Sequence, residues 1–126
     1  MDNDVQTHPA EVEIDLHGYH PDAICGEPLK KIICRAWEMG AQRIRLIHGH
    51  GRNRGISLGF VNTNTGHFGL RIRSELRDDT ELRRWIKHTT LNCRHQGSTD
   101  VKLKSNPAPI RTDFENILPE KAFRIS

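Results

Sequence analysis

Two short stretches of this sequence combine histidines and glycines in a pattern that suits chemistry on a phosphate. They are residues 15–18 (DLHG) and 48–51 (HGHG). Glycine lets the backbone adopt positive φ angles and approach an anion closely, and an imidazole can exchange protons near neutral pH. Three interpretations fit: a phosphate-binding turn, a general acid or base for phosphodiester cleavage, and a divalent-metal site. The alternative is a tight turn whose histidines are structural or solvated.

The elements around these stretches are expected to bring them together. Apolar and polar residues alternate in residues 12–18 and 43–49, which predicts two half-buried strands. Between them, an apolar stripe predicts a helix that either kinks near Gly26 and Pro28 or begins near Glu27. A β-α-β unit of this kind places its two strands in parallel, so their carboxyl ends lie side by side.

The rest of the chain completes an α/β (α+β) two-layer sandwich. Residues 52–66 form a long Gly/Asn/Thr-rich loop, and a second helix starts near Gly69 and continues or restarts at Asp78 or Asp79. Strands are expected at 89–95 and 100–104. The order is βαβαββ, with a four-stranded mixed sheet and helices on one face. We divide the chain into a flexible N-terminal arm (1–10), the domain (11–106) and a C-terminal tail (107–126).

Strand parity predicts that the other face of the sheet is polar and rich in cations. On charge alone, we favour a solvated face whose acids and arginines pair across strands. The residues on this face are Glu13, Asp15, His17, Arg43, Arg45, Lys102 and Lys104.

The overall composition fits a small domain with a polyanionic partner. The chain has 126 residues, with 19 Lys and Arg against 16 Asp and Glu, and a pI near 9.0. No apolar stretch is long enough to span a bilayer, and the N-terminus is unlike a secretory signal. The three cysteines form no C-x-x-C pair. We therefore expect a cytoplasmic monomer that does not bind membranes.

Four segments together resemble the small MutS-related (Smr) domain. Residues 14–18 (IDLHG) match its Leu-Asp-Leu-His-Gly motif, and residues 47–51 (IHGHG) match its His-Gly-x-Gly motif. Residues 69–71 (GLR) resemble its Gly-x-Leu-Arg with one residue fewer, and residues 97–99 (GST) resemble its small-residue turn. The similarity covers about residues 12–104. The loop after the second motif is longer than usual in the family.

The resemblance implies both a fold and an activity. The fold is the same βαβαββ sandwich, similar to the C-terminal domain of a bacterial translation initiation factor. The activity is nucleic-acid binding, with nicking or endonuclease activity in several members. Because the chain contains no ATPase, a mismatch-recognition role does not follow. We expect an endonuclease acting on DNA or RNA; the alternative is a non-catalytic module recruited to a repair or translation-linked complex.

The family motifs and the basic residues around them give the expected site. Asp15 would orient a histidine, His17 or His48 would transfer protons, and Arg71 would stabilise developing charge. The phosphate-binding positions are Gly18, Gly49, His50, Gly51, Arg52 and Arg54. Flanking phosphates would contact Arg43, Arg45, Arg73, Lys102 and Lys104.

We assign no metal ligand, and a divalent cation (Mg²⁺ or Mn²⁺) is the one cofactor left open. A metal-dependent small-molecule hydrolase built on His17, His48 and His50 is less well supported, because acidic ligands are few.

Overall fold

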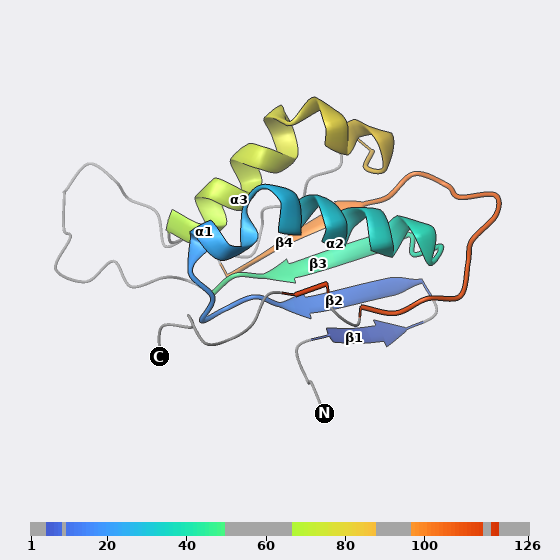
Figure 1. The fold of residues 1–126 in the computed structure, drawn as a ribbon, viewed down its shortest axis with the longest axis horizontal. Helices are drawn as coiled ribbons and strands as arrows, with labels where there is room; N and C mark the ends of the chain where they lie inside the picture. The colour runs from blue at the N-terminus through green and yellow to red at the C-terminus, as the bar shows by residue number, and fades with distance from the viewer. Residues whose placement is uncertain (1–4, 9, 50–66, 88–96, 115–116, 119–126) are drawn as a thin grey trace, which may run out of the picture.

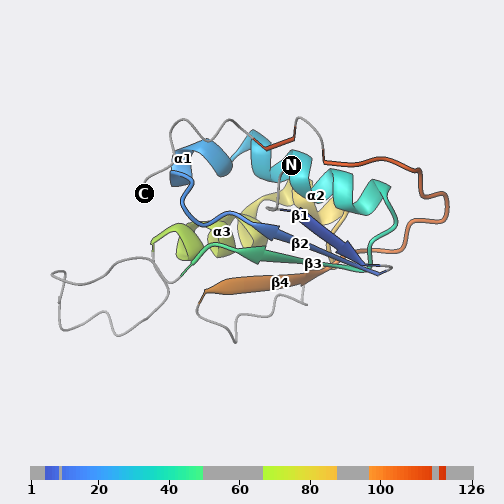
Figure 2. The same cartoon turned by 90° about the horizontal axis from the view of Figure 1, so that it is seen from below.

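The computed structural model describes residues 5–8, 10–49, 67–87, 97–114 and 117–118, which form a four-stranded sheet with helices on one face (Figures 1 and 2). The strands lie in the order β1 (Val5–His8), β2 (Glu11–Asp15), β3 (Arg43–Ile47) and β4 (Ser98–Lys102). The helices are α1 (Pro21–Ile24), α2 (Glu27–Glu38), α3 (His67–Asp78) and the 3₁₀ helix η1 (Thr80–Arg84). Strands β2 and β3 are parallel, and the two outer pairs are antiparallel.

The alternating residues of the strands form the core as predicted. Val12 pairs with Ile44 and Ile14 with Leu46, and all four side chains are buried. They face α2 and α3, which both lie on the same side of the sheet in the two views (Figures 1 and 2). Val101 continues this layer on β4. The period-two pattern therefore identified the buried face correctly.

The predicted irregularity of the first helix is a break at Gly26. Helix α1 ends at Ile24, and α2 begins at Glu27 with Pro28 in its first turn, where no backbone N–H is needed. Gly26 has a φ angle of 98°, a backbone conformation that residues with a side chain rarely adopt. The predicted second helix is also divided into two helices. Helix α3 ends at Asp78, and Asp79 caps the N-terminus of η1.

The strand membership of the sheet differs from the prediction. Three of the four predicted strands are present, and the predicted strand at 89–95 lies outside the described residues. Residues 5–8, which we expected in a flexible arm, form β1 and pair antiparallel with β2, so the expectation is wrong for them. A four-residue strand has too little alternation to be recognised from its sequence, and its pairing with β2 is what defines it. The mixed α and β class is confirmed.

The end of the predicted domain, residues 105–106, and the first part of the predicted C-terminal tail, residues 107–114, pack on α2 and the core. Residues 105–114 run along the end of α2 as the orange-to-red segment in Figure 1. The Asn106 side-chain amide donates to the carbonyl oxygens of Trp37 and Glu38 at 2.9 and 3.3 Å. The Trp37 carbonyl also accepts from the Gly40 N–H at 2.9 Å and the Glu38 carbonyl from the Ile110 N–H at 2.8 Å, so Asn106 and Ile110 together cap the C-terminus of α2. Phe114 then joins the core.

No helix within the described residues is long and apolar enough to cross a membrane.

Candidate active site

The parallel pairing of β2 and β3 brings the two histidine-glycine stretches together. Asp15 lies opposite Ile47 at the ends of the strands, and the Leu16 N–H donates to the Ile47 carbonyl at 2.6 Å. Beyond these residues, a Cβ atom added to Gly49 would lie 3.4 Å from the Cβ of His17. The predicted convergence is confirmed for the described part of the second stretch.

Asp15 and His17 form an accessible dyad. One carboxylate oxygen of Asp15 binds the Nδ1 atom of His17 and also accepts the backbone N–H of His17 at 3.1 Å. The His17 side chain is 58% exposed and that of Asp15 is 32% exposed. Because the carboxylate holds Nδ1–H, the ring is fixed in one orientation and one tautomer. This is the arrangement expected of an oriented acid or base.

His48 is buried, in contrast to His17, and only 4% of it is exposed. Its Nδ1 atom lies 3.0 Å from the Gly49 carbonyl oxygen, and its Nε2 atom lies 3.0 Å from Oγ1 of Thr99. A carbonyl can only accept, so Nδ1 carries a proton, and in this tautomer Nε2 accepts from the threonine hydroxyl. Both ring nitrogens are therefore used within the fold.

Thr99 links His48 to a buried arginine. The Nε atom of Arg73 donates to Oγ1 of Thr99 at 2.8 Å, and another guanidinium nitrogen donates to the Ser98 carbonyl at 3.0 Å. Arg73 is 7% exposed and Thr99 is fully buried. The hydroxyl thus accepts from Arg73 and donates to His48, so these three residues form one connected chain of hydrogen bonds. We call it the Arg73–Thr99–His48 network.

This network corrects one prediction and adds a residue. We expected Arg73 on the nucleic-acid-binding surface, but it points into the interior from α3. Thr99 was not among the expected site residues, and its place in the small-residue turn of residues 97–99 was the one signal that pointed to it. The role of His48 as a proton carrier also loses support, because its ring is buried and both its nitrogens bind protein atoms.

The glycines of the turn have the conformation that was expected, but the N–H of Gly49 already has a partner. Gly18 and Gly49 have φ angles of 89° and 82°. The backbone N–H groups of His48 and Gly49 both donate to the carbonyl oxygen of Gly97, each at 3.0 Å. The Gly49 amide therefore anchors the turn to the start of β4, which argues against its predicted contact with a phosphate. The predicted positions at 50, 51, 52 and 54 lie outside the described residues.

Arg71 lies at the same end of the sheet as the dyad. Figure 1 shows α1 and the start of α3 at the end toward which β2 and β3 point. The Arg71 guanidinium pairs with Asp22 of α1, and this contact lowers the pKa of Asp22 from its ordinary value. The Arg71 side chain is nearly half exposed. Its contact with Asp22 uses one terminal nitrogen, Nη1, of the guanidinium.

The open face of the sheet carries paired charges, as we favoured from the sequence. Arg45 donates to both carboxylate oxygens of Asp100, at 2.8 and 3.1 Å, and lies 3.9 Å from Glu13. The Asp100 contact raises the pKa of Arg45 further above its ordinary value. Arg43 pairs with Glu11 on the neighbouring strand. Of the predicted nucleic-acid-binding residues, Arg43 and Arg45 therefore already contact acids.

Lys102 and Lys104 project to solvent as predicted, while the intervening Leu103 is buried.

The structure gives no metal centre within the described ranges. No group of three or more His, Cys, Asp or Glu side chains there could hold a metal ion. The three-histidine site includes His50, which lies outside those ranges, so that interpretation stays a hypothesis.

In comparisons with known proteins, no family model, no curated protein and no solved structure matches this chain. The resemblance to the Smr domain therefore rests on the four motifs, and it stays a prediction.

Proposed function

We propose that this protein binds nucleic acid and cleaves a phosphodiester bond, with Asp15 and His17 as the acid-base dyad. The observation that carries the proposal is the exposed His17 ring held by Asp15 at the carboxyl ends of β2 and β3. Ligand sites of open α/β sheets form at this edge. The same residues belong to the best-matching motif of the Smr resemblance.

The chemistry assigned to the dyad is proton transfer at a phosphate. His17 would accept the proton of the attacking water or ribose hydroxyl, or donate one to the leaving oxygen. The Asp15 carboxylate would stabilise the imidazolium that forms when His17 takes the proton. Gly49 lies beside His17, since a Cβ atom added there would make an ordinary contact of 3.4 Å with the His17 Cβ, and its φ angle of 82° is the reason for glycine at this position.

The neighbouring residues take supporting roles in the proposal. Arg71 would move its guanidinium from Asp22 to a substrate phosphate and stabilise the charge that develops there. The Arg73–Thr99–His48 network would hold the turn after β3 in place, with His48 as a positioning residue.

The second candidate function is nucleic-acid binding without catalysis. It is favoured by the two exposed lysines at the far end of the sheet face, Lys102 and Lys104, because the arginines of that face are already paired with acids. Lysines contact phosphates as point charges and give affinity that depends on salt rather than on sequence. In this case the protein would act as a module recruited to a larger complex.

Cleavage assays with wild type and His17→Ala test the proposal. The substrates are supercoiled plasmid and end-labelled RNA, each incubated with magnesium, with manganese and with EDTA. We expect wild type to cleave at least one substrate and His17→Ala to be about 10²–10⁴-fold slower, since this is the usual contribution of a general acid or base. Binding by His17→Ala should match wild type.

His67→Ala is the matched control, because His67 is an exposed histidine at the start of α3 outside the dyad. It should cleave at the wild-type rate. Equal cleavage by wild type and His17→Ala would contradict the proposed mechanism. Salt-sensitive binding with no cleavage would leave the binding module as the function.

A further inference from the structure

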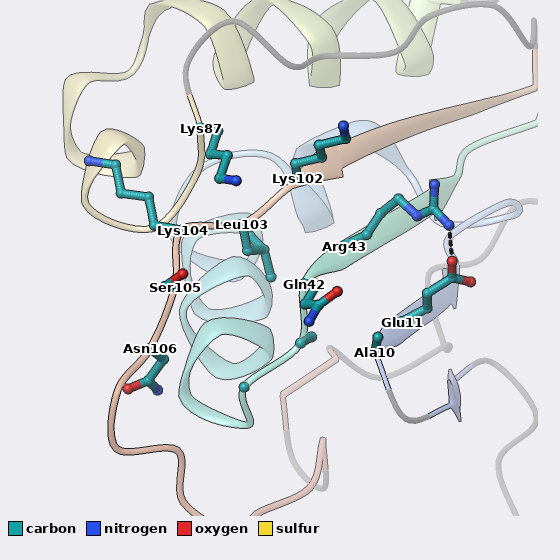
Figure 3. A pocket seen from close by; sticks show the side chains of 12 residues that line it. Ala10, Glu11, Gln42, Arg43, Lys87, Lys102, Leu103, Lys104, Ser105 and Asn106 are labelled. Atoms are coloured by element: carbon teal, nitrogen blue, oxygen red, sulfur yellow. Dashed lines mark hydrogen bonds and ion pairs between the residues drawn. The ribbon is translucent and has the colours of Figure 1, made fainter.

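A basic groove lies at the opposite end of the sheet from the dyad, with a volume of about 540 Å³. Figure 3 shows it between the segment that follows β4 and the start of β3. Its charged lining consists of four cations and one carboxylate, which is already paired with an arginine. These residues are Arg43, Lys87, Lys102, Lys104 and Glu11.

The fold fixes the three lysines of this groove next to one another. The Lys87 N–H donates to the Lys102 carbonyl at 2.9 Å, and the Lys104 N–H donates to the Trp85 carbonyl at 2.7 Å. Between these two hydrogen bonds, Ile86 and Leu103 form an isolated antiparallel β-bridge, and both of their side chains are buried. With residues 86 and 103 anchored inward, residues 87, 102 and 104 project outward. Backbone hydrogen bonds thus hold the three lysine residues next to one another, with the Lys104 amine pointing away from those of Lys87 and Lys102 in Figure 3.

We propose that this groove, which we call the lysine groove, binds the sugar-phosphate backbone of the nucleic acid that is cleaved at the dyad. The inference rests on the proposed function and adds the substrate class: a polynucleotide rather than a nucleotide or a dinucleotide. Groups of lysines suit this ligand, because they attract successive phosphates without a fixed hydrogen-bond geometry.

The spacing of the two sites sets a minimum substrate length. Glu11 lines the groove and Asp15 belongs to the dyad, and they are the first and last residues of β2. Four steps of about 3.3 Å along a strand separate them by about 13 Å. In a stacked strand, at about 3.4 Å per nucleotide, this corresponds to about four nucleotides. A substrate must extend at least this far from the scissile bond to use both sites.

The surface between the two sites does not attract phosphate. The row across its middle contains Glu13, Arg45 and Asp100, two carboxylates and one guanidinium. A nucleic acid would therefore make its strong contacts at the two ends of the sheet and not along the centre.

A length series tests the inference by fluorescence anisotropy. The probes are labelled oligonucleotides of about three and about twelve nucleotides, and the variant is Lys102→Gln/Lys104→Gln. For the longer probe, we expect the slope of log affinity against log salt to fall by about two and the Kd to rise about tenfold, because two phosphate contacts are lost. For the trinucleotide, which is too short to span both sites, the variant should lose less affinity than it does for the longer probe, because the trinucleotide can still bind at the dyad end.

Lys31→Gln/Arg77→Gln is the matched control, since it removes two exposed charges on α2 and α3 outside the groove. If the groove variant binds the longer probe as tightly as this control does, the lysine groove does not hold the substrate. If the trinucleotide loses as much affinity as the longer probe, the groove is a small-anion site and the length argument is wrong. If wild type binds neither probe and cleaves nothing, the proposed function fails as well.

Discussion

Replacing Asp15 by Asn is expected to slow cleavage by about 10²–10⁴-fold while leaving the protein folded. In the wild type, one Asp15 oxygen accepts from both the His17 ring and the His17 backbone N–H. An amide oxygen can keep both contacts, but it has no charge to stabilise the imidazolium. If the amide nitrogen faces the ring instead, His17 must adopt the wrong tautomer. Single-turnover cleavage of a labelled substrate measures the effect.

Asp78→Asn is the control for this substitution, because Asp78 is an exposed carboxylate at the end of α3. It should cleave as wild type does. If Asp15→Asn also cleaves at the wild-type rate, the carboxylate has no part in the reaction and the dyad is only a turn.

Replacing Thr99 by Val is expected to lower the free energy of unfolding by about 2–4 kcal/mol. Valine has the same shape, so the loss reports hydrogen bonds rather than packing. The substitution removes the acceptor of the Arg73 Nε–H and the donor to the His48 ring, and all three residues are buried. A buried polar group without a partner is costly, above all when it is charged. Urea denaturation followed by circular dichroism gives the change.

Thr80→Val is the matched control for the buried threonine. Thr80 is the exposed first residue of η1, so the same substitution there should change stability by less than about 0.5 kcal/mol. A similarly small change for Thr99→Val would show that the network does not stabilise the fold.

Local periodicity was enough to predict the elements that position the dyad. Val12 and Ile14 alternate with acids on β2, and the intervening helix requires β3 to run parallel, so the approach of His17 to Gly49 follows from the topology. The break at Gly26 was also visible, because glycine and proline interrupt an apolar stripe there.

The parts that could not be predicted depend on contacts between distant residues. From the sequence, Arg73 is expected to be a surface cation, and its contacts with Ser98 and Thr99, 25 and 26 residues away, explain why it is buried. The burial of His48 was likewise not predictable, because the motifs alone do not distinguish its role from that of His17. For Arg45, the alternation of residues along the strand predicted the correct face of the sheet. Its bidentate contact with Asp100 depends on the register of β4, which the sequence does not show.

The central claim is that His17 carries the chemistry and His48 holds the turn. It is tested most directly by measuring cleavage and urea stability for His17→Gln and His48→Gln side by side. We predict that His17→Gln unfolds at the wild-type urea concentration and has lost cleavage, whereas His48→Gln unfolds at a lower concentration because the Arg73–Thr99–His48 network is broken. Full cleavage by His17→Gln, together with a stable but inactive His48→Gln, would contradict it.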